Sequence, residues 1–229
     1  MNTLLQNSGL AFAVALILAV LDWLVVHHER KLAEYFFKPA TLVAVIVAAW
    51  LVTRGPHDVW MASFFLPGLV CSLIGDVFLM LPDERFFVPG LASFLAAHIC
   101  YIVGLNPVLP SLLVLIPLVI VAVIGALLFR GIISSMRRQG QQALLGPVVL
   151  YGLILSVMLL SAWATLFRPA PPWTPLRRAC VIAGASLFFA SDSMLAWEKF
   201  VEPLPLGHLK VMITYHLAQV ALAASMALI

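Results

Sequence analysis

Two aspartates stand inside long apolar stretches of the sequence. Asp76 lies in the run Ser72–Leu79 and Asp192 in the run Leu187–Leu195, and each directly follows a small residue and precedes a leucine by three positions. A charged Asp in the middle of a membrane helix costs roughly 2.5–3.5 kcal/mol, so intramembrane ionisable groups usually have a function. Two such acids suit acid–base catalysis, in which one carboxyl donates a proton while the other stays charged. The alternative is that each carboxylate is structural and is satisfied by a neighbouring helix.

Further polar side chains lie in or beside the other apolar stretches. His98 and Tyr101 share one helical face, where they either line a wet cavity or belong to the core, with His98 bonded to a backbone carbonyl. Tyr215 and Gln219 share another face and either belong to the site or join helices. Lys38 either extends to the lipid head groups or points inward to pair with a carboxylate or a phosphate. The residues predicted to bind substrate or to support the aspartates are therefore Lys38, Ser72, His98, Tyr101, Ser191, Tyr215 and Gln219.

Asp22 is a weaker acidic candidate. Trp23, His27 and His28 follow it, and these residue types indicate that this part of the chain approaches the membrane interface. A carboxylate there would be reached by water, and we do not expect it to take part in catalysis.

Two other kinds of catalytic site are disfavoured. The stretch Gly184–Leu187 lacks the second glycine of a serine-hydrolase elbow. A catalytic zinc normally needs three protein ligands, and the histidines away from the ends of the predicted spans are His98 and His216 alone. We therefore predict neither a metal nor another cofactor.

The composition is that of an integral membrane protein. The chain has 229 residues, of which 63% are hydrophobic, and a mean hydropathy of +1.09. Because irregular backbone cannot face lipid, we predict an all-α, polytopic transmembrane bundle of about eight helices, forming one integral membrane domain over residues 1–229. No basic stripe with interleaved aromatic residues is present, which argues against a nucleic-acid partner. Cys71, Cys100 and Cys180 fall inside predicted spans and are expected to pack as small apolar residues.

The predicted spans follow from the apolar runs and their flanking breaks. The run that begins near Ser8 lacks the basic flank of a signal peptide, so we expect it to be a retained helix. Pro39 is placed at the opening of the second helix, because proline suits a first helical turn. The expected spans are about Ser8–His28, Lys38–Thr53, Val59–Leu81, Phe86–Leu105, Pro110–Phe129, Ala143–Phe167, a seventh that follows Arg178 and ends near Phe200, and His208–Ile229.

The distribution of lysine and arginine predicts the orientation. Eight spans place both termini on one side, which holds Arg54, Arg168, Arg177 and Arg178. The opposite side holds Arg30, Lys31, Lys38, Arg85, Arg130, Arg137, Arg138, Lys199 and Lys210. Since cytoplasmic loops carry the excess of basic residues, the termini are predicted to lie outside. Asp76 and Asp192 then lie roughly 7.5 and 12 Å inside the cytoplasmic ends of their helices. The predicted location is the inner (plasma) membrane of a bacterium.

The order and spacing of these motifs resemble the YhhN family of membrane proteins, whose characterised members are lysoplasmalogenases. The residues that carry the resemblance are Lys38-Pro39, Gly75-Asp76 with Leu79, Gly90, Phe94, His98, Tyr101, Tyr151, Phe188, Ser191-Asp192, Tyr215 and Gln219. They span the second to the eighth predicted helix. One departure is His216, where a second aromatic residue would be expected beside Tyr215.

The resemblance implies hydrolysis of the vinyl ether bond of a lysoplasmalogen, a lysophospholipid of the bilayer, to a fatty aldehyde and a glycerophospho-head group. One of Asp76 and Asp192 would protonate the vinyl carbon, and the other would stabilise the oxocarbenium ion and orient water; the residues do not tell which. Two other classes stay open, namely a proton- or cation-coupled transporter or channel that uses the same Asp pair, and a lipid-binding protein without turnover. The oligomeric state also stays open.

Overall fold

The computed structural model describes residues 2–108, 111–168 and 173–227, with only the backbone for residues 2–6. Within these residues the chain forms eight α-helices and no strand, which confirms the predicted all-α bundle. Three short 3₁₀ turns, Glu84–Phe86, Leu112–Val114 and Thr165–Phe167, flank α4, α5 and α6. The α-helices are α1 (Asn2–His27), α2 (Lys31–Val52), α3 (Val59–Met80), α4 (Phe87–Leu105), α5 (Leu115–Arg138), α6 (Gln142–Ala164), α7 (Pro175–Phe200) and α8 (Gly207–Ala224).

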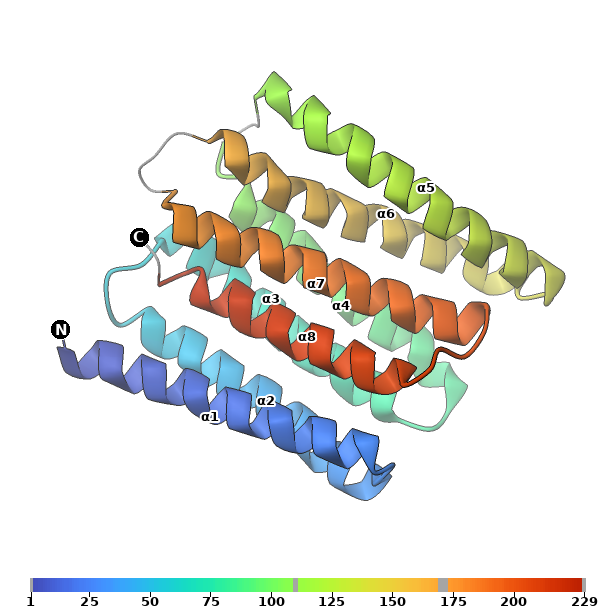
Figure 1. The fold of residues 1–229 in the computed structure, drawn as a ribbon, viewed down its shortest axis with the longest axis horizontal. Coiled ribbons are helices and arrows are strands. Elements are labelled where there is room, and N and C mark those ends of the chain that lie inside the picture. Colours follow the sequence, from blue (N-terminus) through green and yellow to red (C-terminus); the bar gives the residue numbers. More distant parts are fainter. Residues whose placement is uncertain (1, 109–110, 169–172, 228–229) are drawn as a thin grey trace.

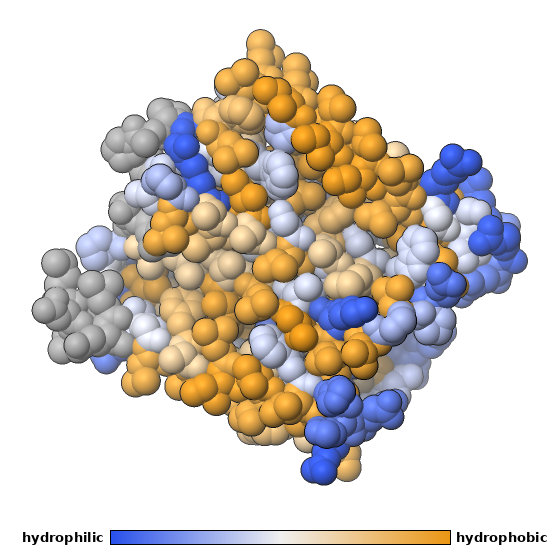
Figure 2. Space-filling model, viewed as in Figure 1, coloured by the Kyte–Doolittle hydropathy of each residue, from blue (hydrophilic) through white to orange (hydrophobic). Residues whose placement is uncertain are grey.

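The helices run roughly parallel or antiparallel to one another (Figure 1). In this view α7 and α8 lie in front of α3 and α4, while α1 and α2 form one side of the bundle and α5 and α6 the other. Both termini lie at the same end, which we call the terminal end. The opposite end, called the basic end below, holds the connections α1–α2, α3–α4, α5–α6 and α7–α8. Hydrophilic residues gather at the two ends, with an apolar belt between them (Figure 2).

Seven helical spans among the described residues are long and apolar enough to cross a membrane, and α8 is not one of them. This helix has 18 residues and packs against α1, α2, α3 and α7. Because it is enclosed, α8 can carry Tyr215, His216 and Gln219 as buried residues, and these polar groups lower its hydropathy. The helix that falls short of a membrane-spanning apolar stretch therefore carries polar groups in the interior of the bundle.

Glycines hold α3 and α4 close together. An added Cβ at Gly75 would lie 2.6 Å from the Phe94 ring, and one at Gly90 would lie 2.6 Å from Leu79. An added Cβ at Gly68 would lie 2.7 Å from the Tyr101 ring, and one at Gly104 would lie 2.8 Å from the Phe65 ring. Small residues at a helix interface let two backbones approach, which is the main source of packing between membrane helices. This packing brings the helix of Asp76 against the helix of His98.

The second helix begins earlier than predicted. It starts at Lys31 and contains Pro39 in its interior, so the prediction that Lys38-Pro39 opens this helix was wrong. With 22 residues, it is also longer than the short span predicted from the sequence. A proline is tolerated inside a membrane helix because neighbouring groups can satisfy the carbonyl that it frees. As a consequence, Lys38 lies about 10 Å inside the helix, at 1.5 Å per residue.

The fifth helix extends further toward the basic end than predicted. It runs over Leu115–Arg138 instead of ending at Phe129, and Gly140, with φ +73°, follows it. The predicted basic loop is therefore mostly helix, because the chain breaks only at the glycine that can adopt a left-handed conformation. Pro110, the predicted start of this helix, lies outside the described residues.

The start of α7 also differs from the prediction. Thr174 caps the helix by accepting a hydrogen bond from the Arg177 amide at 3.2 Å, and Pro175 occupies the first turn. Threonine and proline are favoured at these two positions. Arg177 and Arg178 consequently lie inside the helix and not before it. Of the predicted rigid connector 168–172, only Arg168 lies within the described residues.

Candidate functional site

A cavity of ≈ 130 Å³ opens among α2 to α8 in the half of the bundle next to the basic end. This is about ten times the 10–15 Å³ that a single water molecule needs on the same measure. Most of its wall is apolar, and the charged or titratable side chains that line it are Lys38, Asp76, Tyr151, Asp192, Lys199, His208 and Tyr215. Both predicted catalytic aspartates therefore face one cavity.

Asp76 has a partner on each of its two carboxylate oxygens. Lys38 Nζ lies 3.2 Å from Oδ1, and the Tyr215 hydroxyl donates a hydrogen bond of 2.7 Å to Oδ2. All three side chains are buried. Of the two orientations left open for Lys38, the structure shows the inward one. An ammonium and a hydroxyl donor together stabilise the ionised form of this carboxyl group.

Asp192 has a different set of neighbours. The Tyr151 hydroxyl donates a short hydrogen bond to Oδ2, and His98 Nε2 lies 3.8 Å from the same oxygen, which is too long for a hydrogen bond. No ion pair with Lys or Arg is formed by Asp192 in the described part of the chain. The two carboxyl groups thus differ in environment, as a division of labour between acid and carboxylate requires.

Tyr151 is a site residue that the chemical argument from sequence missed. It stands on α6, ten residues into the helix, and its ring also meets the His98 ring at 5.3 Å between centroids. The available signal was a lone tyrosine in an apolar run, whose hydroxyl needs a partner when it is buried.

The remaining predicted supporting residues lie behind the cavity wall or have their hydroxyl groups engaged. The Tyr101 hydroxyl donates to Gln219 Oε1 at 2.9 Å, which joins α4 to α8. Ser72 is fully buried but does not line the cavity. Ser191 does line it, while its hydroxyl donates to the Val211 carbonyl at 3.1 Å and so joins α7 to α8. Ser191 thus ties the helix of Asp192 to α8, and Tyr101 and Gln219 tie α4 to the same helix.

Phe188 packs at the centre of the site. Its ring contacts the rings of His98, Tyr215, Phe94 and Tyr101, at centroid distances from 4.7 to 6.4 Å. It is fully buried between polar groups on α4 and α8. Such a packed aromatic centre fixes the orientation of the groups around it.

Asp22 lies near the end of α1, but the bundle encloses it. Its side chain is 0% exposed, and neither carboxylate oxygen has a hydrogen-bond partner among the described residues. It lies in α1 and does not line the cavity. The chain continues as helix for five residues after Asp22, and α2 and α8 pack against α1, so the aspartate is enclosed.

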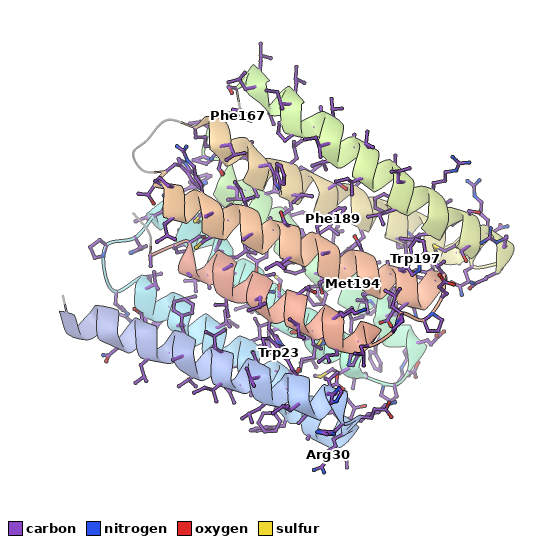
Figure 3. All side chains as sticks on the ribbon, viewed as in Figure 1. Trp23, Arg30, Phe167, Phe189, Met194 and Trp197 are labelled. Carbon is purple, nitrogen blue, oxygen red and sulfur yellow. The ribbon has the colours of Figure 1, made fainter. Side chains whose placement is uncertain are left out.

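His216, the departure from the family pattern, is accommodated by α1. Trp23 lies between α1 and α8 (Figure 3), and its Nε1 donates a 3.1 Å hydrogen bond to His216 Nδ1. The two rings are stacked with centroids 6.4 Å apart. The imidazole thus has a polar partner outside the cavity and is not a part of its lining.

The lining residues follow a definite order along the bundle. Lys199 and His208 stand in the helical turns nearest the basic end, in α7 and α8. At 1.5 Å per residue, Asp76 lies about 6 Å and Asp192 about 12 Å inside the ends of their helices. On the same scale Phe189 lies about 16 Å and Leu155 about 20 Å inside. From the basic end inward, the charged lining therefore begins with Lys199 and His208 and continues with the carboxyl groups, and the deepest part of the lining is apolar.

Comparison with known proteins gives one family. The sequence profile of the YhhN family matches residues 33–226. Lysoplasmalogenase TMEM86B of Homo sapiens is 37% identical over 200 residues, which cover 86% of this chain and 77% of the relative. Lysoplasmalogenase TMEM86B of Mus musculus is 32% identical over 217 residues, which cover 93% of this chain and 84% of the relative. The uncharacterized membrane protein YhhN of Escherichia coli O157:H7 is 28% identical over 161 residues, which cover 69% of this chain and 70% of the relative.

No solved structure matches the chain. The matched region includes all seven charged or titratable residues that line the cavity. Its length also far exceeds half of the sequence. The chain is therefore a member of the YhhN family.

Proposed function

We propose that this protein hydrolyses the vinyl ether bond of lysoplasmalogens. The support comes from relatives that are named lysoplasmalogenases and from a cavity in which two carboxyl groups meet an apolar wall. The observation that carries the proposal is the unequal pairing of these two groups. Asp76 has Lys38 and Tyr215 on its two oxygens, whereas Asp192 has Tyr151 and a more distant His98.

The reaction needs a proton donor and a water molecule. The donor protonates the vinyl carbon that does not bear oxygen, which gives an oxocarbenium ion. Water then adds to the carbon that bears oxygen and loses a proton to the donor's carboxylate. In the resulting hemiacetal the bond to the glycerol oxygen breaks. That oxygen takes up a proton and the hemiacetal hydroxyl loses one, so the products are a fatty aldehyde and a free glycerophospho-alcohol. One water molecule is consumed, and the acid is regenerated.

We assign the proton donor to Asp192. Both oxygens of Asp76 accept interactions from donors, one of them an ammonium at 3.2 Å, so this group holds no proton and stabilises the cation as it forms. In Asp192, Tyr151 occupies Oδ2, and Oδ1 is the oxygen that we assign to proton transfer. The geometric requirement is that the vinyl carbon reaches Oδ1 while the oxocarbenium ion faces Asp76.

The direct test is aldehyde release by the purified protein in detergent with a lysoplasmalogen as substrate. We expect stoichiometric aldehyde and glycerophospho-alcohol, and no release from the saturated alkyl analogue, which cannot form the oxocarbenium ion by protonation. Absence of aldehyde from a folded preparation would contradict the proposal. The mechanism also uses no metal ion, so a loss of turnover on chelation that zinc restores would contradict this part of it.

We further propose that the chain forms one integral domain of a bacterial inner membrane, with both termini outside and the cavity opening toward the cytoplasm. The excess of Lys and Arg at the basic end supports this orientation, because cytoplasmic ends of membrane helices carry that excess. Reporter fusions at the C-terminus are the test. A cytoplasmic C-terminus would reverse the orientation and place the mouth of the cavity outside.

A further inference from the structure

We infer that Lys199 and His208 form a binding site for the phosphate of the lysolipid head group at the mouth of the cavity. This inference rests on the proposed function, since it names the part of the molecule that holds the substrate's head. Both residues line the cavity that contains Asp76 and Asp192. They come from different helices, Lys199 from the last turn of α7 and His208 from the first turn of α8.

The charges in the cavity single out these two residues. Lys38 is buried against Asp76 at 3.2 Å, so its charge is already compensated. The side chains of Lys199 and His208 are 30% and 52% exposed and can meet an anion that enters from the basic end. A diester phosphate is the anion of a lysophospholipid, and Lys is a common point-charge partner for phosphate.

The acidic partner of Lys199 can be replaced. Glu84 lies 3.6 Å from Lys199 Nζ, but it is 92% exposed, and exposed pairs of this kind are worth about 0–1 kcal/mol. A phosphate bound at the mouth would therefore displace Glu84, which stays solvated. Glu34 pairs with His208 at 2.7 Å and is only 15% exposed, so this pair is kept and the phosphate would bind beside it.

The wall of the cavity holds Lys199 in place. Its Nζ lies 4.4 Å from the centre of the Phe87 ring, and Phe87 itself lines the cavity. A cation over an aromatic face is attracted by the ring. The ammonium is therefore held beside the cavity instead of extending into solvent.

The spacing along α7 fits a lysoplasmalogen. Lys199 follows Asp192 by seven residues, which is about two helical turns on the same face and about 10 Å of rise. Side chains of a helix lean toward its N-terminus, so the long lysine side chain shortens this span. In the substrate, six bonds join the vinyl ether carbon to the phosphorus, or about 7–8 Å if three bonds span 3.8 Å. A phosphate at Lys199 therefore brings the vinyl ether to Asp192.

The rest of the cavity accepts the single tail. Beyond the carboxyl groups, its wall is formed by Leu128, Phe129, Leu155 and Phe189. An apolar chain buried there contributes roughly 0.8 kcal/mol per CH₂ group. The order of phosphate, vinyl ether and tail in the lipid thus matches the order of basic, carboxyl and apolar groups in the protein.

The test is a binding experiment that does not depend on turnover. The full-length protein in detergent is titrated with a saturated 1-O-alkyl lysophospholipid, with the 1-O-alkylglycerol of the same chain length, and with glycerophosphocholine. We expect the lysophospholipid to bind about tenfold more tightly than the alkylglycerol, the scale of one interaction with a charged group. Glycerophosphocholine should bind far more weakly than the intact lipid, because it lacks the tail.

The variants locate the site. Lys199→Met and His208→Ala should each reduce the preference for the phosphate-bearing lipid about tenfold or abolish it, with unchanged affinity for the alkylglycerol. Lys199→Arg should keep the preference, because it keeps the charge. Lys210→Met is the matched control: Lys210 is an exposed lysine at the same end that does not line the cavity, and its loss should leave all three affinities unchanged.

Three results would overturn the inference. The first is equal affinity of the parent protein for the lysophospholipid and the alkylglycerol. The second is an equal loss of affinity for these two lipids in Lys199→Met. The third is binding of glycerophosphocholine as tight as that of the intact lipid. The proposed hydrolysis fails separately, since a protein that shows the phosphate preference but releases no aldehyde keeps the binding site and loses only the activity.

Discussion

Lys38 Nζ lies 3.2 Å from Asp76 Oδ1, with both side chains buried at the wall of the cavity. Removing one partner of a buried ion pair leaves an uncompensated charge, which typically costs about 3–5 kcal/mol. We therefore expect Lys38→Met to melt at a much lower temperature than the parent protein. The double variant Lys38→Met/Asp76→Asn should recover a large part of that stability, because no charge is left alone, but it should not recover turnover.

The measurement is thermal melting of both variants and of Asp76→Asn in one detergent, analysed as a double-mutant cycle. Strictly additive losses would mean that the two side chains do not interact in the folded protein, and would contradict the structure at this point.

The two aspartates should both be needed for catalysis. Asparagine keeps the volume and a hydrogen-bonding side chain but cannot carry out the acid or the carboxylate role, so Asp76→Asn and Asp192→Asn should each lower kcat about 10²–10⁴-fold. Asp22→Asn is the matched control, because Asp22 is equally buried but lies outside the cavity. It should keep turnover within about threefold and melt at the parent temperature or above, since it removes a buried carboxylate without a hydrogen-bond partner.

Aldehyde release and melting are measured on the same preparations. Near-normal turnover in either Asp76→Asn or Asp192→Asn would remove that residue from catalysis. If activity falls only together with folding, the carboxylate is structural.

The Tyr151 hydroxyl should matter for kcat because it donates to the oxygen of Asp192 that does not transfer the proton in our assignment. Tyr151→Phe keeps the ring and removes this bond, and we expect kcat to fall about tenfold, on the scale of one hydrogen bond to an ionisable group. Tyr101→Phe is the comparison, since that hydroxyl donates to Gln219 away from the cavity. Equal turnover in the two variants would show that the Tyr151–Asp192 bond has no part in the reaction.

The close approach of α3 and α4 predicts a difference between two glycines. In Gly75→Ala the new Cβ would lie 2.6 Å from Phe94, whose ring packs against Tyr215, so we expect a lower melting temperature and a lower kcat. Gly9, in α1, has no atom within 4 Å of an added Cβ. Gly9→Ala should keep turnover and melt at the same or a higher temperature, because alanine favours a helix by up to about 1 kcal/mol over glycine. Equal melting of the two variants would contradict the tight helix contact.

Asp58 predicts how stability depends on pH at the terminal end. Burial raises the pKa of this carboxyl, but hydrogen bonds from the Met61 amide and the Arg177 guanidinium lower it, and the pKa ends below its usual value of 3.8. A depressed pKa in the folded state stabilises the protein above the unfolded pKa, and this contribution is lost as pH falls from 3.8 through the lower folded value. We expect the melting temperature of Asp58→Asn to fall by less than that of the parent protein between pH 6 and pH 3.

Asp83→Asn is the control for this pH series, because Asp83 pairs with Arg85 on the surface, where both side chains are largely exposed. Surface pairs contribute little, so its pH profile should follow that of the parent. A parent-like profile in Asp58→Asn would contradict the role assigned to the Asp58–Arg177 pair.

The sequence alone predicts the number of helices and the location of both termini at one end. It also predicts that five polar residues face inward, namely Asp76, His98, Asp192, Tyr215 and Gln219. The physical reason is that apolar runs of membrane-spanning length must be helical, and that a polar group in such a run must face the interior of the bundle. The inward position of these polar residues follows from the sequence of each helix without reference to any other helix. The bounds of α3 and α4 were likewise predicted to within a residue or two.

The partners of these residues were decided by the tertiary structure. Lys38 forms an ion pair with Asp76, which is 38 residues away in the sequence. Tyr151 donates a hydrogen bond to Asp192, 41 residues away, and Tyr215 donates one to Asp76, 139 residues away. Hydropathy sets which side of a helix faces inward, but the rotation and depth of each helix against its neighbours follow from contacts such as those of Gly75 and Gly90. The burial of Asp22 was also decided by the tertiary structure, since the packing of α2 and α8 against α1 has no counterpart in the local sequence.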